Sequence, residues 1–222
     1  MGLSISVGLL ADLYHNDTEG FAYHRDAFGQ LTRALAAEGI DWREPETGSG
    51  PAAHPYSAGF PYGHLTRLRR VYVLDQAGEP ITPAAQIGTS RYERDLQRIT
   101  DETMMLASHL LCHADDSGYY LPLDFADPLF LPAQPALEGG GMVGSCPRLL
   151  RELGGIAPAL GIRLEGDGDG AGDDGGRLTD AEAARLAAGP RDDPFEPEKS
   201  AWLELYRSCA ASIAGGHAIV FC

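Results

Sequence analysis

The order of hydrophobic and polar positions along the chain predicts a mixture of strands and helices. The first thirteen residues, MGLSISVGLLADL, are rich in Ile, Val and Leu with partial alternation, which is typical of a β-strand. The last six residues, HAIVFC, form another β-like run, and a terminal strand of this kind is usually part of a sheet. We therefore expect both ends of the chain to be strands.

Apolar residues spaced by three and four predict helices between these two runs. The first helix should begin at a capping box made by Asn16 and Glu19, present an apolar face from Phe21 to Leu35, and end before Gly39. Further helices are expected over residues 64–76, 91–107, 146–153 and 179–188, and from residue 194 or 197 to residue 213. Four to five strands without strict alternation with helices predict an α+β class: a single domain over residues 1–222, with a mixed sheet flanked by helices.

The stretch Ser108–Phe125, SHLLCHADDSGYYLPLDF, concentrates histidines, aspartates, tyrosines and a cysteine. In a helix, His109 and His113 would share a face about 6 Å apart and could bind one metal ion. In a strand they would lie about 13 Å apart and could not. We favour a strand, because residues 119–125 alternate like a β-strand and residues 115–118 have turn composition, so a β-hairpin would supply the partner.

On this hairpin model, the turn and the start of its second strand form the candidate catalytic site, which consists of His113, Asp115, Asp116, Tyr119 and Tyr120. The alternative is a structural turn, since aspartates in turns usually bind backbone amides.

If the first strand ends beside this turn, a second set of ligands could hold a divalent metal, namely His15, Asp17, His113 and Asp115. No zinc spacing, phosphate-binding glycine loop or nucleophile motif occurs, so no cofactor is predicted beyond that metal.

Two long loops carry further expectations. Residues 45–63 are rich in Pro and Gly but end with Tyr56, Phe60 and Tyr62. Because disordered linkers are poor in aromatic residues, we expect these three side chains to pack or to bind a ligand. Residues 165–176, EGDGDGAGDDGG, are expected to form a flexible acidic loop, since the pattern fails as a calcium loop at Ala171 and Leu178.

Charge narrows the class of function. The 222 residues include 32 acidic and 17 basic side chains, giving a net charge of −15, and residues 165–198 alone hold 11 acidic and 3 basic ones. Such a chain repels phosphate backbones, so nucleic acid is not expected as a partner. Four scattered cysteines, with no signal peptide and no membrane-spanning run, indicate reduced thiols in the cytoplasm and no membrane partner.

These observations favour an acidic interaction protein that binds a basic protein partner, for example an immunity-type inhibitor of a toxin. The alternative is a small metal-dependent hydrolase with a His/Asp pocket; the oligomeric state is left open. The segments MGLSISVGLLADL, GFPYGHL, SHLLCHADDSGYYLPLDF and WLELYRSCAASIAGGHAIVF resemble a family of hypothetical proteins from high-GC bacteria. The resemblance implies a shared architecture and no activity, so no functional residue is carried over from it.

Overall fold

The apolar runs at the two ends of the chain pair with each other in the middle of a sheet. β1 (Leu3–Val7) and β6 (Ile219–Phe221) are antiparallel neighbours, with Ile5 opposite Phe221. The structure, a computed structural model, describes residues 2–45, 56–132, 137, 141–166, 176–190 and 192–221, and the statements below concern these residues. Pairing the two ends of the chain closes the fold around one sheet.

The sheet has six strands in the order β2–β1–β6–β3–β5–β4. β3 (Gly118–Leu121) and β5 (Met142–Ser145) form its parallel pair, and the other neighbours are antiparallel. The edges are β2 (Tyr56–Phe60) and β4 (Leu129–Phe130). The sheet is therefore mixed, as expected, and slightly wider than the four to five strands that the sequence predicts.

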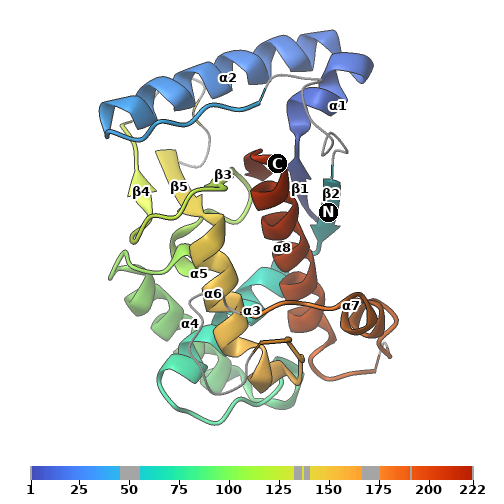
Figure 1. The fold of residues 1–222 in the computed structure, drawn as a ribbon. Coiled ribbons are helices and arrows are strands. Elements are labelled where there is room, and N and C mark those ends of the chain that lie inside the picture. Colours follow the sequence, from blue (N-terminus) through green and yellow to red (C-terminus); the bar gives the residue numbers. More distant parts are fainter. Residues whose placement is uncertain are drawn as a thin grey trace.

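Helices cover both faces of the sheet (Figure 1). α1 (Leu9–Asn16) and α2 (Thr18–Ala37) lie on one face, where Phe28 and Leu31 join Tyr119 in an apolar cluster. α3 (Tyr62–Gln76), α6 (Cys146–Ile156) and α8 (Glu196–Gly215) lie on the other, around Tyr120. Neighbouring residues of a strand point to opposite faces, which is why the two tyrosines enter different clusters.

The remaining helices lie outside these two layers (Figure 1). They are α4 (Thr89–Thr103), α5 (His109–Cys112) and α7 (Asp180–Ala187), together with short 3-10 turns at Ala84–Gln86 and Pro158–Leu160. Among the described residues, no helix is both long and apolar enough to cross a lipid bilayer. The arrangement confirms the α+β class.

The first predicted strand is too long. The chain leaves β1 at Gly8, which adopts a left-handed conformation (φ 72°), and then turns into α1. Gly is the residue that takes this conformation without steric cost. The cap of α2 is also displaced by one residue, because the Asp17 side chain, rather than Asn16, accepts hydrogen bonds from the amides of Glu19 and Gly20.

The predicted β-hairpin at residues 108–125 is wrong. Residues 109–112 form the one-turn helix α5, in which the Ser108 hydroxyl accepts a hydrogen bond from the Leu111 amide. The partners of β3 are β5 and β6, which come from later parts of the chain. A hairpin is the shortest way to give β3 a partner, but here the partners come from far along the sequence.

Candidate functional site

The segment from His113 to Tyr120 is mostly packed into the fold. His113 is 3% exposed, and its ring stacks on Tyr120 with centroids 4.2 Å apart. Its Nδ1 lies 2.7 Å from the carbonyl oxygen of Ala114. Burial lowers the pKa of His113 to about 3, so the imidazole is neutral at physiological pH.

Arg69 of α3 fixes the backbone of this segment. Its guanidinium donates to the carbonyl of Leu110 over 2.9 Å and to that of His113 over 2.5 Å, and it also binds the Asp115 carboxylate. Asp116 is exposed and forms no ion pair with a described residue. These contacts suit a structural turn, and a catalytic role for the segment stays a prediction.

Tyr119 and Tyr120 do not share a site. Tyr120 lies beneath the sheet, where its hydroxyl donates to the carbonyl of His109 over 2.8 Å. Tyr119 lies on the other face, with its ring 6.0 Å from that of Phe28 in α2. The five catalytic candidates are therefore divided by the sheet itself.

The four metal candidates are divided in the same way. His15 is exposed at the end of α1 and Asp17 caps α2, whereas His113 is buried beneath the opposite face of the sheet with Asp115 nearby on Arg69. Within the described ranges, no group of three or more His, Cys, Asp or Glu side chains is placed to hold a metal ion.

Two of the three aromatic residues at residues 56–62 pack against the fold. The Tyr56 hydroxyl donates to the Glu204 carboxylate of α8 over 2.6 Å, and Phe60 is 4% exposed in the core. Tyr62, at the start of α3, is 42% exposed. Binding by these residues stays a prediction, and residues 46–55 of the same loop lie outside the described part of the chain.

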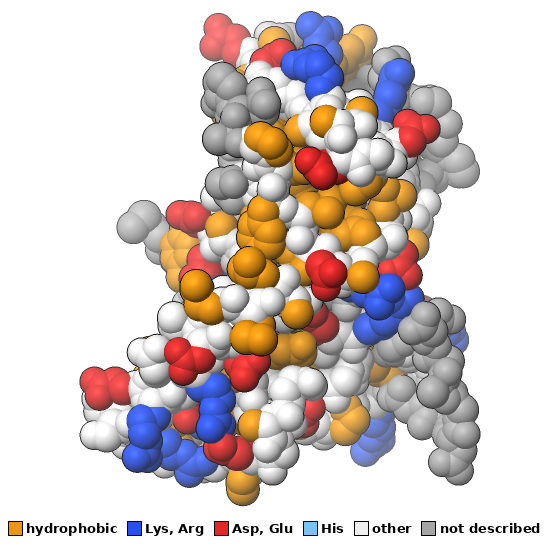
Figure 2. All heavy atoms as spheres, turned by 90° about the vertical axis from the view of Figure 1, so that its left-hand side faces the viewer, with side chains coloured by type: hydrophobic (Ala, Val, Ile, Leu, Met, Phe, Trp, Pro, Cys, Tyr) orange, Lys and Arg blue, Asp and Glu red, His pale blue; other side chains and the backbone are white. Residues whose placement is uncertain are grey.

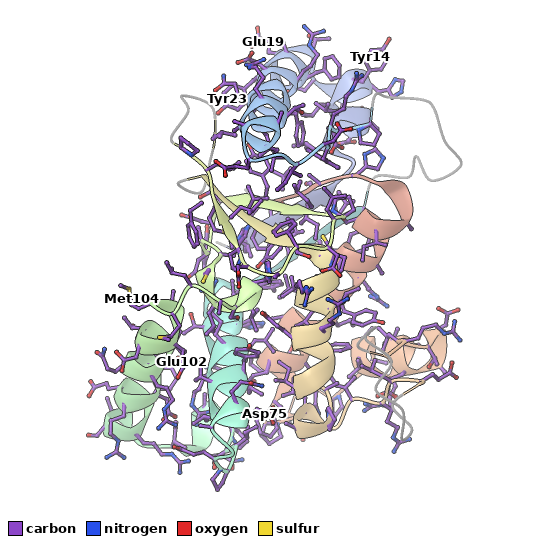
Figure 3. The ribbon with its side chains drawn as sticks, turned by 60° about the vertical axis from the view of Figure 1, so that its left-hand side comes forward. Tyr14, Glu19, Tyr23, Asp75, Glu102 and Met104 are labelled. Carbon is purple, nitrogen blue, oxygen red and sulfur yellow. The ribbon has the colours of Figure 1, made fainter. Side chains whose placement is uncertain are left out.

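Carboxylates gather on the α1–α2 layer without basic partners. We define the α1–α2 acidic surface as Asp12, Asp17, Glu19 and Asp26, which are all exposed. Asp12 and Asp26 accept hydrogen bonds from the amides of Asn16 and Gln30, and none of the four forms an ion pair with a described residue. Tyr14 and Tyr23, 54% and 50% exposed, lie near Glu19 on this layer (Figure 3).

Elsewhere in the described chain, most basic side chains are already paired with carboxylates. The pairs are Arg69–Asp115, Arg70–Asp95, Arg98–Glu79, Arg148–Asp124, Arg151–Asp124, Arg177–Glu165, Arg185–Glu182, Lys199–Asp193 and Arg207–Glu204. Internal pairing thus consumes basic charge and leaves the negative excess on unpaired carboxylates. The acidic loop predicted at 165–176 adds more, but residues 167–175 lie outside the described residues.

A comparison with protein families shows which family the chain belongs to. The model of the family described as "Putative DNA-mimic protein" matches residues 1–221. The chain belongs to this family. No curated protein and no solved structure matches it.

The DNA-mimic family corrects the partner predicted from the sequence. That prediction set nucleic acid aside and left a basic protein of unspecified kind. A family described by mimicry of DNA is connected with DNA after all, through the proteins that recognise it. The repulsion argument concerned direct contact between this protein and DNA. It overlooked that a negatively charged surface, which repels DNA, also resembles the surface of DNA. The acidic interaction role is the part of the functional prediction that the family supports.

Proposed function

We propose that this protein docks on the DNA-contacting surface of a DNA-binding protein and keeps DNA from it. The observation that carries the proposal is membership of the DNA-mimic family, joined to a surface whose carboxylates have no basic partners within the described chain. The α1–α2 acidic surface is the described part that we assign to the contact.

Electrostatics supports such a complex. A surface that binds DNA is rich in Lys and Arg, and much of its affinity comes from neutralising phosphates. Exposed carboxylates replace those phosphates as the negative partner, and complementary charge speeds association and favours the right partner. Binding of this kind weakens as salt increases, because exposed charges are screened.

The α1–α2 acidic surface alone is too sparse to imitate a duplex. Glu19 and Asp26 are seven residues apart on α2, which separates them by about 10 Å along the helix axis. Duplex DNA carries one negative charge per about 1.7 Å of its axis. On the face shown in Figure 2, acidic side chains are scattered among basic and apolar ones. The proposed contact therefore needs acidic groups beyond α2 and uses apolar contacts such as Tyr14 and Tyr23 as well.

The sequence-based proposal of an immunity-type inhibitor is a narrower case of the same function, in which the DNA-binding partner is a toxin. A DNA-binding partner also fits the proposed cytoplasmic location. The three described cysteines, Cys112, Cys146 and Cys209, are free thiols, as expected there. The alternative, a metal-dependent hydrolase, would need a set of ligands that the described residues do not assemble.

The test is competition with DNA. The protein is immobilised, incubated with a nuclease-treated lysate of its source cells, and eluted with a duplex oligonucleotide of mixed sequence. We expect the eluate to be enriched in DNA-binding proteins. A DNA-binding protein purified from the eluate should then dissociate from a labelled duplex in a gel-shift assay when an equimolar amount of the acidic protein is added.

The matched control is the variant Asp12→Asn/Asp17→Asn/Glu19→Gln/Asp26→Asn, which keeps side-chain size and the capping oxygen of residue 17. This variant should capture less DNA-binding protein from the lysate, and it should displace less labelled duplex in the gel-shift assay. Elution by salt but not by duplex DNA would show binding outside the DNA-contacting surface and would contradict the proposal.

A further inference from the structure

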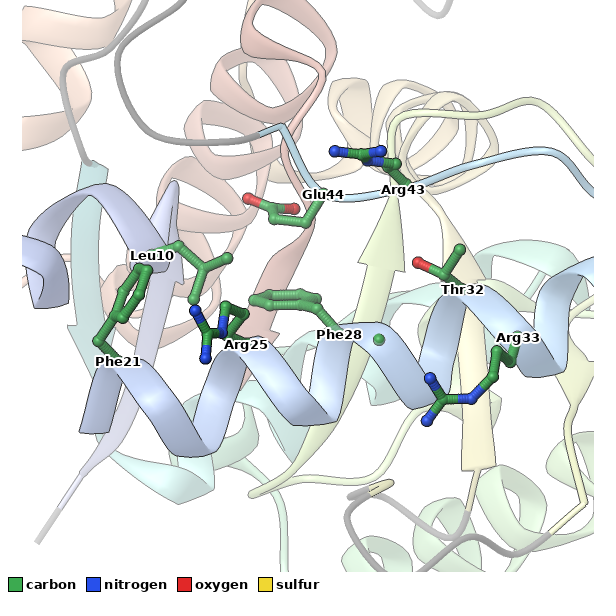
Figure 4. Close-up of a pocket in the computed structure, with 9 residues that line it drawn as sticks. Leu10, Phe21, Arg25, Phe28, Thr32, Arg33, Arg43 and Glu44 are labelled. Carbon is green, nitrogen blue, oxygen red and sulfur yellow. The ribbon is translucent and has the colours of Figure 1, made fainter. Parts of the chain in front are cut away.

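A pocket of about 570 Å³ lies between α2 and the segment that follows it. It is lined by Leu10, Phe21, Arg25, Phe28, Gly29, Thr32, Arg33, Arg43 and Glu44 (Figure 4). This volume is within the range of sites for small organic molecules, about 300–1,000 Å³. The lining joins an apolar floor to three arginines, in a protein whose net charge is −15.

One stripe of α2 builds most of this lining. Phe21, Arg25, Phe28 and Thr32 recur at intervals of three and four, so they face the pocket together. The guanidinium of Arg25 lies 5.6 Å from the centre of the Phe21 ring, which holds the cation at the edge of the apolar floor. Leu10 of α1 and Arg43 complete the walls from outside α2.

Two of the arginines have no carboxylate partner within the described chain. Neither Arg25 nor Arg33 forms an ion pair with a carboxylate of the described residues, although unpaired carboxylates are abundant in this protein. The one carboxylate in the lining, that of Glu44, is engaged elsewhere. Its oxygens accept hydrogen bonds from the His217 ring over 2.7 Å and from the Ala218 amide over 2.8 Å.

Gly29 keeps the pocket open. It lies in the interior of α2, where glycine destabilises a helix by about 0.5–1 kcal/mol relative to alanine. Packing does not require it, since a Cβ at this position would meet only the Arg33 guanidinium, at 3.6 Å. By contrast, a Cβ at Gly20 would come within 2.5 Å of the capping Asp17 carboxylate. Gly29 therefore gives up helix stability at a position where a side chain would enter the pocket.

We propose that this pocket binds a small organic anion, with its carboxylate or phosphate on Arg25 and its flat apolar body on Phe28. Arginine suits both head groups because its planar donors bind two oxygens at once. The aromatic floor contributes by burying apolar surface. The site is distinct from the proposed docking surface for a DNA-binding protein, which uses exposed carboxylates and apolar contacts but no pocket.

The test is isothermal titration calorimetry of the full chain with matched probes. The anionic probes are 1-naphthoate and 1-naphthyl phosphate. The neutral probe is 1-naphthalenemethanol, which shares the naphthyl body of 1-naphthoate, and inorganic phosphate supplies the head group alone. We expect at least one anionic probe to bind at least tenfold more tightly than both the alcohol and inorganic phosphate. The preferred head group distinguishes a carboxylate ligand from a phosphate ligand.

Three variants assign the binding to the pocket. Arg25→Gln should weaken the preferred anion at least tenfold, and Gly29→Leu should abolish its binding while raising the melting temperature. Arg94→Gln, which removes an exposed arginine from α4 at the far end of the molecule, should leave binding unchanged. Equal binding of the alcohol, no binding of either anion, or binding retained by a folded Gly29→Leu variant would each overturn the proposal. None of these outcomes depends on DNA competition, so this site and the docking function fail separately.

Discussion

Two regions of the molecule carry many polar side chains and use them in opposite ways. Beneath the sheet, the Glu152 carboxylate of α6 accepts hydrogen bonds from the Ser108 hydroxyl over 3.1 Å and from the amides of His109 and Leu110 over 2.8 and 2.7 Å. It thereby fixes the start of α5. On the α1–α2 acidic surface, the carboxylates lie in solvent and form no ion pair with a described residue.

The difference teaches where polar chemistry is available to a partner. Groups that bind each other inside the fold stabilise it, and removing one leaves the others unsatisfied. Groups that face solvent unpaired cost little to remove and remain free to bind another molecule. By this criterion the groups of residues 108–125 that bind one another inside the fold stabilise it, and a catalytic role for this segment stays a prediction. The α1–α2 acidic surface is the better candidate for a contact.

The largest effect should come from breaking the Glu152 contacts. Glu152→Ala leaves the amides of His109 and Leu110 without their acceptor, and we expect it to lower the free energy of unfolding by about 3 kcal/mol at pH 5. Urea denaturation followed by circular dichroism measures this loss. Glu102→Ala, at the exposed end of α4, is the control and should change stability by less than about 0.5 kcal/mol.

The same carboxylate predicts a pH dependence. Burial raises the pKa of Glu152 from 4.5 to about 7, against the opposing effect of its three hydrogen bonds. The folded protein then binds more protons than the unfolded chain between these two values, so its stability falls as pH rises through that window. Glu152→Ala should flatten this fall. An unchanged slope in the variant would show that Glu152 titrates normally.

A smaller effect, on binding rather than folding, should come from the α1–α2 acidic surface. The four-residue amide variant introduced above should raise the dissociation constant for the DNA-binding partner about 30-fold. This corresponds to roughly 2 kcal/mol for four lost charges. Its stability should change by less than about 1 kcal/mol, because Asn at position 17 still caps α2. Titrations at two salt concentrations should also show a shallower salt dependence.

A second set of charges tests whether position matters. The control variant Asp75→Asn/Glu93→Gln/Asp101→Asn/Glu102→Gln removes the same charge from α3 and α4, toward the other end of the molecule (Figure 1). It should bind the partner nearly as well as the parent protein. Equal weakening by both variants would mean that net charge alone drives the contact.

Glu198 of α8 is an exception among the buried polar groups. Replacing it should stabilise the protein, whereas replacing Glu152 should destabilise it. Glu198 is 0% exposed, and neither carboxylate oxygen has a hydrogen-bond partner among the described residues. Burial raises its pKa, so this group favours the folded state at low pH, and that contribution is lost as pH rises through the folded-state pKa. Glu198→Gln should therefore raise stability by about 1 kcal/mol at pH 8 and change little at pH 4.5.

Thermal denaturation at the two pH values measures this gain. Glu196→Gln, in the first turn of the same helix and only partly buried, is the control and should show no such pH-dependent gain. Destabilisation by Glu198→Gln at pH 8 would mean that the carboxylate has a partner when ionised.

Local signals in the sequence predicted much of this fold. Ser145 caps α6 and Thr179 caps α7, as their positions ahead of apolar runs indicate. The helix at 109–112 was considered but not favoured, because a four-residue run shows no periodicity and its stabilising group, Glu152, lies some forty residues away. The sequence also predicted the wrong partner for β3, because its partners β5 and β6 come from later parts of the chain.

The proposed contact surface and pocket were harder to predict than the fold. The apolar stripe of α2 marks Phe21 and Phe28, but the pocket depends on Leu10 and Arg43, which only the folded chain brings to them. Likewise, the sequence shows how many carboxylates there are, while the ion pairs that leave some of them free depend on tertiary contacts. Net charge therefore indicated an interaction role without locating it.

A similarly small effect should come from Tyr120, a catalytic candidate of the sequence. Tyr120→Phe removes one buried hydrogen bond, from its hydroxyl to the carbonyl of His109, and keeps the ring that stacks on His113. We expect a loss of about 1 kcal/mol in urea denaturation and no change in affinity for the DNA-binding partner. If Tyr120→Phe kept its stability but lost affinity for the DNA-binding partner, residues 108–125 would have a functional role despite their burial.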